Sequence, residues 1–289
     1  MIKKLKTISN LVVLPHSVFA LPFALSSLLT ATHGKPSLQL LGLVILAMVL
    51  ARTTAMAYNR LVDADIDAQN PRTKKREIPA GRISKLEVGL LTAGAGLGFV
   101  ATCYFINDLA FKLSPLALFI VGFYSHTKRF TWASHLFLGL ALGVAPVGAW
   151  VAATGKLDLE PFWMTGAVIC FLAGFDILYA TQDEAFDKKA GLHSWVVRWG
   201  VPNSLKASRF FHFGMLGFLA GFGVLAGFST LYYIGLGVLA AVLIYQHQKA
   251  YRLERKGKGF KFTLSPAMMA MNGWIAVLYF VIVALTLWL

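Results

Sequence analysis

The sequence predicts an all-α protein whose helices cross a membrane nine times. Hydrophobic residues make up 57% of the 289 residues and only 14% are charged. The apolar residues fall in long blocks, whereas a soluble protein of this size shows shorter amphipathic runs. A block of roughly 20 apolar residues crosses the hydrocarbon core of a bilayer as a helix. We therefore expect one domain, residues 1–289, built as a single bundle of transmembrane helices.

The positions of the spans follow from these blocks. The first block has no evident small-residue cleavage site, and further spans follow it, so we interpret it as a helix and not as a signal peptide. The third and fourth spans are separated only by a short polar stretch around Asn107. The expected spans cover residues 12–32, 39–59, 87–107, 109–125, 134–153, 161–181, 209–228, 230–249 and 267–288.

Positive charge is distributed unevenly over the loops. With a cytoplasmic N-terminus, the loops on the opposite side hold only Lys35, Lys112 and Lys156 of the 27 lysines and arginines. The positive-inside rule therefore predicts an internal N-terminus and an external C-terminus in the cell's inner (cytoplasmic) membrane. The bilayer accounts for the net charge of +14 without a nucleic-acid partner. Loops 60–86 and 184–208 are expected to cap a central cavity that opens to the cytoplasm.

The first cluster of oxygen-bearing side chains lies where the second expected span, residues 39–59, gives way to a loop. It consists of Asn59, Asp63 and Asp67. On one continuous helix these residues stand at i, i+4 and i+8 and project from nearly the same face. Three oxygen-bearing side chains in a row at a membrane border resemble half of a metal site.

A second acidic cluster closes the sixth span. Asp183 and Asp187 are again four residues apart, and Asp176 lies two turns earlier on nearly the same face. Both clusters occupy the same end of helices that run in the same direction, four helices apart. This pattern is typical of a parallel internal repeat, which places a site at the interface between repeats.

Carboxylates at membrane depth are energetically unfavourable unless other groups compensate their charge. Insertion scales put the cost of such a charge at about 2.5 to 3.5 kcal/mol unless it faces a polar cavity and a partner. Converging like charges repel one another, so we expect cations between them. Oxygen ligands suit Mg²⁺, and the lack of a His or Cys at ligand spacing argues against zinc. The predicted metal-binding and catalytic residues are Asn59, Asp63, Asp67, Asp183 and Asp187.

Basic residues surround both clusters. Each one alone is explained as a positive-inside anchor, but beside a metal site some of them should bind phosphate oxygens. A metal-bound diphosphate at the mouth of an apolar bundle indicates a lipid diphosphate substrate. The candidate diphosphate-binding residues are Arg60, Arg72, Lys74, Lys128, Arg129 and Lys188.

The two acidic clusters belong to longer strings of residues. These strings are Asn59-Arg60-x-x-Asp63-x-x-x-Asp67, Asn70-Pro71-Arg72-Thr73, Ile78-Pro79-Ala80-Gly81, Asp176-x-x-Tyr179-Ala180-x-Gln182-Asp183-x-x-x-Asp187 and Gly191-Leu192-His193-Ser194. Together they resemble the UbiA superfamily of intramembrane aromatic prenyltransferases over essentially the whole chain. The second motif looks most like the 4-hydroxybenzoate polyprenyltransferase branch. The stretch Phe19–Phe23 resembles a subgroup associated with menaquinone made by the futalosine route.

The resemblance implies Mg²⁺-dependent transfer of a polyprenyl group from polyprenyl diphosphate to the ring of 4-hydroxybenzoate or a related hydroxylated aromatic acid, in ubiquinone or menaquinone biosynthesis. The metal makes diphosphate a better leaving group. The prenyl cation then attacks the ring carbon ortho to the hydroxyl. Tyr179, Tyr124 and Tyr58 are candidates to face the cation with their rings, although plain packing explains each of them equally well.

The acceptor site is less defined by sequence. Arg52 lies in the interior of a span, seven residues before Asn59 and two turns deeper on the same face. It pairs with the acceptor carboxylate, helps to hold diphosphate, or forms a structural ion pair with a residue such as Asp176. Asp176 itself is a candidate for acceptor contact or cation stabilisation. His16 and His193 are possible polar contacts.

Three other functions stay open. Within the superfamily, haem O synthase and a dihydroxynaphthoate prenyltransferase use other acceptors, and the second motif argues against both. A cation transporter with acidic intramembrane sites belongs to a different class. Basic loops beside both acidic pairs favour the enzyme, and the sequence leaves the prenyl chain length and the oligomeric state undetermined.

Overall fold

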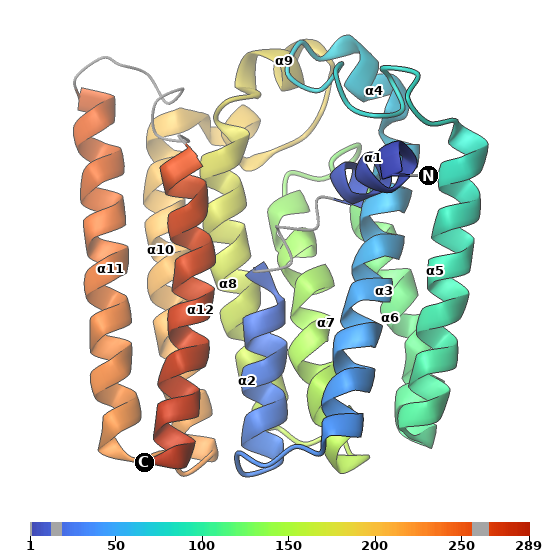
Figure 1. Cartoon of the computed structure of the whole chain (residues 1–289). Helices are drawn as coiled ribbons and strands as arrows, with labels where there is room; N and C mark the ends of the chain where they lie inside the picture. The colour runs from blue at the N-terminus through green and yellow to red at the C-terminus, as the bar shows by residue number, and fades with distance from the viewer. Residues whose placement is uncertain (1, 13–18, 256–265) are drawn as a thin grey trace. The chain divides into compact units, whose positions relative to one another are not determined.

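The structure, a computed structural model, describes residues 2–12, 19–255 and 266–289. Within these ranges every regular element is a helix, which confirms the predicted all-α class. Figure 1 labels the helices. In chain order they are α1 (Ile2–Val12), α2 (Leu21–Ala31), α3 (Leu38–Val62), α4 (Ala64–Gln69), α5 (Lys85–Ile106), α6 (Asp108–Thr127), α7 (Ser134–Thr154), α8 (Glu160–Ala180), α9 (Glu184–Lys189), α10 (Trp195–Leu225), α11 (Thr230–Arg255) and α12 (Pro266–Trp288).

Eight of the described helices are long and apolar enough to cross a bilayer, namely α3, α5, α6, α7, α8, α10, α11 and α12. The chain is therefore an integral membrane protein. The first predicted span, residues 12–32, is not confirmed as one membrane-crossing helix. Its residues 13–18, which include His16, lie outside the described residues, Val12 is the last residue of α1, and Leu21–Ala31 form the shorter apolar helix α2.

Helix α10 differs from its prediction. It begins at Trp195, whereas the sequence analysis started the span at residue 209 and assigned residues 184–208 to a loop. Polar side chains such as Arg198 and Lys206 hid the first turns from an argument based on hydropathy. The backbone of Gly200 is non-helical, with φ 73° and ψ 169°, so a kink separates these turns from the rest of the helix. The expected loop therefore consists largely of α9 and the start of α10.

The described residues form two compact units. The first contains α1 and Ser37–His126, and the second contains α2 and the described residues from Thr127 onward. In the first unit α3 packs along α5, and α1 lies against α3 (Figure 1). Leu11 on α1 and Ala57 on α3 join Val88 on α5 in a small apolar core. This core fixes the end of α3, where the first acidic motif begins.

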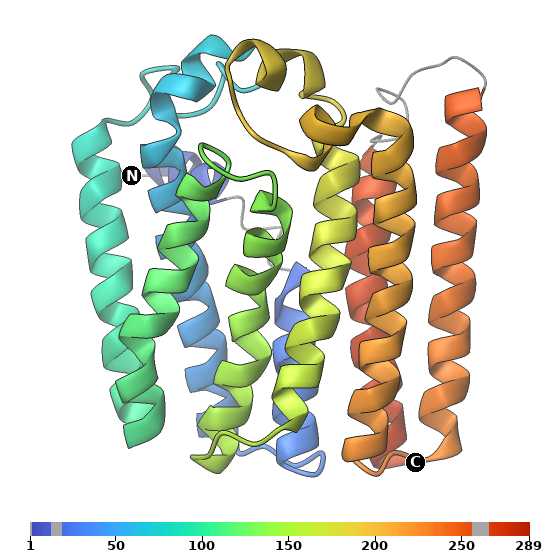
Figure 2. The same cartoon turned by 180° about the vertical axis from the view of Figure 1, so that it is seen from behind.

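The second unit is organised around α8. This helix packs against α7 on one side and α10 on the other, as Figure 2 shows, and α2 fills the space beside α7 and α12. Phe171 on α8, Phe23 on α2 and Tyr279 on α12 are completely buried in its apolar core. The central position of α8 holds the helix end that carries the second acidic motif.

The crossing of α7 and α8 depends on a glycine. A Cβ atom on Gly139 would lie 2.7 Å from both the Cα and the carbonyl oxygen of Ile169. Backbone atoms of a buried helix cannot move aside as a flexible side chain can. Small residues allow this kind of close backbone approach between membrane helices.

We expect Gly139→Ala to destabilise the protein by about 1 to 3 kcal/mol, because the added methyl group forces α7 and α8 apart. The measurement is a thermal-unfolding midpoint in detergent. Gly148→Ala on the same helix is the matched control, since nothing lies within 4 Å of its added Cβ. Equal midpoints for the two variants would contradict the assigned role of Gly139.

Candidate active site and its two aspartate motifs

The first motif lies where α3 ends. The helix stops at Val62, and Asp63, with φ −89° and ψ 0°, leads into the six-residue helix α4. The expectation of one continuous helix from Asn59 to Asp67 is therefore wrong at Asp63. The Asp63 N–H still donates to the Asn59 carbonyl (3.0 Å) and the Asp67 N–H to the Asp63 carbonyl (2.8 Å). These i to i+4 bonds preserve the helical spacing through the junction.

Asp63 is a buried carboxylate, with only 2% of its residue surface exposed. The Asn59 amide N–H donates to Asp63 Oδ2 (3.4 Å) and to Ser125 Oγ on α6 (3.3 Å). Asn59 and Asp63 thus lie together, as the sequence predicts. The amide of Asn59 orients the carboxylate from the side of α6.

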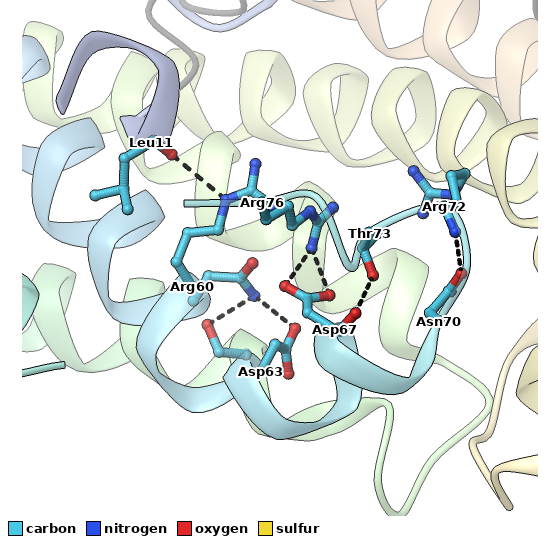
Figure 3. A network of polar contacts seen from close by, with 10 residues as sticks. Leu11, Arg60, Asp63, Asp67, Asn70, Arg72, Thr73 and Arg76 are labelled. Carbon is cyan, nitrogen blue, oxygen red and sulfur yellow. Dashed lines mark hydrogen bonds and ion pairs between the residues drawn. The ribbon is translucent and has the colours of Figure 1, made fainter. Parts of the chain in front are cut away.

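Asp67 is held by an arginine. Arg76 Nη1 lies 2.7 Å from each of the two Asp67 carboxylate oxygens, as Figure 3 shows. The Thr73 hydroxyl also donates to the Asp67 carbonyl (3.1 Å), which folds the following turn back on α4. Sequence reasoning counted Arg76 only among many basic residues. Because it lies in a loop, its partner was not deducible from helical spacing.

The candidate diphosphate-binding residues of this unit differ in burial. Arg60 is buried and its Nε donates to the Leu11 carbonyl at the end of α1 (3.4 Å; Figure 3). Arg72 and Lys74 are exposed in the loop after α4. The Arg72 backbone N–H donates to the Asn70 side chain (2.9 Å). Arg60 therefore anchors α1 to α3, while the other two present their side chains to solvent.

Three further candidates lie on α3 and α6. Arg52 and Tyr124 are half-buried, on α3 and α6 respectively. The Tyr58 hydroxyl forms a hydrogen bond with His126 Nε2 (3.0 Å). This bond ties the two helices one turn before the acidic motif, so Tyr58 has a structural partner of its own.

The second motif repeats the backbone of the first. Helix α8 ends at Ala180, Asp183 has φ −100° and ψ 0°, and α9 follows as another six-residue helix. The Asp187 N–H donates to the Asp183 carbonyl at 2.8 Å, the same distance as in the first motif. Both aspartates are half-buried. From the first aspartate onward the two motifs are therefore built alike. They differ before it, because the Asp183 N–H donates to the Ala180 carbonyl three residues earlier (3.0 Å), whereas the Asp63 N–H donates to a carbonyl four residues earlier.

The string Gly191-Leu192-His193-Ser194 starts α10. The Ser194 hydroxyl accepts from the Val197 N–H (3.2 Å), which caps the helix. The His193 N–H donates to the Lys128 carbonyl (2.8 Å) and so joins this string to the loop between α6 and α7. Arg129 in that loop is exposed. Lys188 on α9 pairs with Glu184 at 2.8 Å in an exposed ion pair.

Asp176 has a partner that sequence reasoning missed. His135 on α7 lies with its Nδ1 2.7 Å from Asp176 Oδ2, and its Nε2 accepts from the Trp195 backbone N–H (3.2 Å). The only signal in the sequence was that a carboxylate inside an apolar helix needs a donor. Tyr179, one turn further along α8, is half-buried with its ring 6.2 Å from that of Phe175.

The donors in these motifs suit a hard cation. Each motif offers two carboxylates, and the first adds an amide, which are ligands that Mg²⁺ accepts together with phosphate oxygens. In the parts of the chain that the structure describes, no three His, Cys, Asp or Glu side chains gather as a ready-made metal cluster. The residues present therefore fit Mg²⁺ held jointly with a ligand such as diphosphate.

Known proteins share these features. The family model "UbiA prenyltransferase family" matches residues 20–274. The 4-hydroxybenzoate octaprenyltransferase of Thiobacillus denitrificans is 33% identical over 215 residues, which are 74% of this chain and 73% of that protein. The enzyme of the same name from Shewanella sediminis is 29% identical over 231 residues, 78% of this chain and 81% of that one.

Solved structures have the same fold. An apo UbiA homolog from Aeropyrum pernix superposes with a TM-score of 0.78 at 32% identity, covering 91% of this chain and 97% of that one. A UbiA homolog from Archaeoglobus fulgidus, solved with GPP and Mg²⁺ bound, gives a TM-score of 0.73 at 22% identity, covering 98% of this chain and all of that one. With its repeated aspartate motifs and all-helical membrane fold, the chain belongs to the UbiA prenyltransferase family.

Proposed function

We propose that this prenyltransferase uses Mg²⁺ to transfer a polyprenyl group from polyprenyl diphosphate to the ring of 4-hydroxybenzoate or a related hydroxylated aromatic acid. The product would enter ubiquinone or menaquinone biosynthesis. The observation that carries the proposal is the pair of aspartate motifs, each with the same backbone hydrogen bond between its two aspartates and each following an apolar helix. Relatives named for octaprenyl transfer to 4-hydroxybenzoate support the acceptor. We assign the protein to the inner (cytoplasmic) membrane, with both motifs facing the cytoplasm.

Asn59, Asp63, Asp67, Asp183 and Asp187 would hold the metal ions. Mg²⁺, when bound, neutralises the charge that develops on the departing diphosphate. The burial of Asp63 strengthens its attraction for a cation, because little water screens the carboxylate. Arg76 keeps Asp67 neutralised until a cation replaces the guanidinium. Arg72, Lys74, Lys128, Arg129 and Lys188 supply charge for the phosphate oxygens, whereas Arg60 acts through its anchoring of α1.

The reaction breaks the allylic C–O bond and forms a bond from the allylic carbon to the ring carbon ortho to the hydroxyl. That carbon then loses its proton, which restores aromaticity. The rings of Tyr124 and Tyr179 would stabilise the positive charge on the prenyl group. We assign Arg52 to the acceptor carboxylate, since it is a basic residue in the interior of a predicted span, two turns before Asn59.

The function is tested with the purified chain in liposomes, supplied with Mg²⁺, prenyl diphosphates of several lengths and separate acceptors. The acceptors are 4-hydroxybenzoate, dihydroxynaphthoate and haem B, and mass spectrometry identifies the product. We expect prenylated 4-hydroxybenzoate. Exclusive prenylation of either other acceptor would replace this assignment, and ion flux without any prenylated product would favour a cation transporter.

We expect Asp63→Ala and Asp183→Ala each to lower kcat at least about 100-fold, because each removes an oxygen ligand at the departing diphosphate. The measurement is product formation at saturating substrates, with folding checked by gel filtration in detergent. Asp65→Ala is the control, because Asp65 lies in the first motif with its side chain 86% exposed in an ion pair with Lys85. Retained activity in both motif variants would refute the metal assignment.

We expect Arg76→Gln to lower the thermal-unfolding midpoint without added Mg²⁺ and to enlarge the rise that Mg²⁺ plus a prenyl diphosphate produces. The free energy of unfolding falls by about 1 to 3 kcal/mol, because the Asp67 carboxylate loses its charged partner. A bound cation then takes the place of that partner and stabilises the folded protein. Lys85→Gln serves as the control, since it removes an exposed ion pair of the same unit. An unchanged Mg²⁺ response in Arg76→Gln would show that Arg76 does not compete with the metal.

A further inference from the structure

The contact between α7 and α8 contains an Asp and a His of unequal exposure. The His135 side chain is 4% exposed, whereas that of Asp176 is 28% exposed. His135 uses both of its ring nitrogens, one toward Asp176 and the other toward the Trp195 backbone. The carboxylate is therefore the accessible end of a buried arrangement.

The backbone contact defines the tautomer of His135. A peptide N–H can only donate, so Nε2, which receives the Trp195 N–H, carries no proton. Nδ1 then carries the proton and donates to Asp176 Oδ2 (2.7 Å). A second proton on the imidazole would break the bond to Trp195. His135 thus donates from Nδ1 to the Asp176 carboxylate while its Nε2 accepts from the backbone.

The Asp176 carboxylate accepts one hydrogen bond from His135 and has further lone pairs that can accept others. A ligand that meets Asp176 must therefore offer a hydrogen-bond donor, and a second carboxylate would be repelled. A hydroxylated aromatic acid carries one group of each kind. The hydroxyl end fits Asp176, and the carboxylate end does not.

We propose that Asp176 accepts a hydrogen bond from the ring hydroxyl of the aromatic acceptor, and that His135 is the positioning residue that holds this carboxylate. The proposal rests on the function proposed above and names the group that orients the acceptor. The hydrogen bond directs electron density into the ring. The carbon ortho to the hydroxyl, where the new bond forms, is the carbon that gains from it.

The position of Asp176 on α8 agrees with this role. It stands four residues before the last residue of α8, about 6 Å along the helix axis, and Asp183 follows just beyond the helix end. The hydroxyl end of the acceptor would therefore lie about two helical turns from Asp183, the first residue of this motif assigned to the metal and diphosphate. This places the attacked carbon, and not the acid group, toward the departing diphosphate.

Three variants of the full chain in liposomes test the proposal, with kcat and KM measured for both substrates. In Asn the amide is as many bonds from Cα as His Nδ1, so His135→Asn keeps a donor for Asp176. In Gln the amide is as many bonds away as Nε2, so His135→Gln keeps an acceptor for the Trp195 N–H and has no donor at the position of Nδ1. Asp176→Asn removes the charge and keeps the shape.

We expect His135→Gln to raise the acceptor KM about tenfold with the prenyl diphosphate KM unchanged, and His135→Asn to stay near the wild type. We expect Asp176→Asn to lower kcat/KM for 4-hydroxybenzoate about 10- to 100-fold. With 4-methoxybenzoate, an activated ring that has no hydroxyl to donate, the same variant should differ little from the wild type.

Equal losses in His135→Asn and His135→Gln, or a parallel rise in both KM values, would show that the His–Asp contact only holds α7 to α8. Equal losses of Asp176→Asn with the hydroxyl and methoxy acceptors would also overturn the proposal. In these cases the wild type remains an aromatic prenyltransferase. A wild type that prenylates no hydroxylated aromatic acid would instead refute the proposed function, and this inference with it.

Discussion

A carboxylate near the apolar part of a membrane protein needs a hydrogen-bond donor or a cation, and the organisation of the described site follows from this constraint. The chain meets it in two ways. Asp67 is paired with a charged guanidinium from a loop, and Asp176 is hydrogen-bonded by a neutral imidazole inside the helix packing. A loop arginine can be exchanged for another cation. A buried histidine used on both nitrogens cannot leave, so the two aspartates suit different tasks.

The two motifs share a backbone solution as well as a sequence pattern. In each, a long apolar helix ends just before an aspartate with ψ near 0°, and a helix of six residues follows. The aspartate carbonyl accepts the N–H of the aspartate four residues later, at 2.8 Å in both motifs. A short helix set off in this way keeps the two carboxylates of a motif at helical spacing. It also separates them from the apolar helix that precedes them.

The sequence predicted the coarse features correctly because they depend on local composition. Apolar blocks identified the eight described helices that are long and apolar enough to cross a membrane, and acidic residues at i and i+4 identified both motifs. The start of α10 was missed because its first turns are polar and are organised by the Ser194 cap and by Gly200. The continuous helix through Asp63 was wrong because spacing alone does not reveal a break at one residue.

By itself, the sequence determined the membrane class, the family resemblance and the aspartates that define the two motifs, because these properties lie in the order and type of neighbouring residues. Tertiary structure decided their partners. His135 stands 41 residues from Asp176, and the two meet only because α7 packs closely along α8 at Gly139. The tautomer of His135 then depends on one backbone N–H at the start of α10. Contacts between distant segments set the hydrogen-bond partners and the orientation of the carboxylate, since hydrogen bonding in a buried site depends on which groups the packing brings within hydrogen-bond distance.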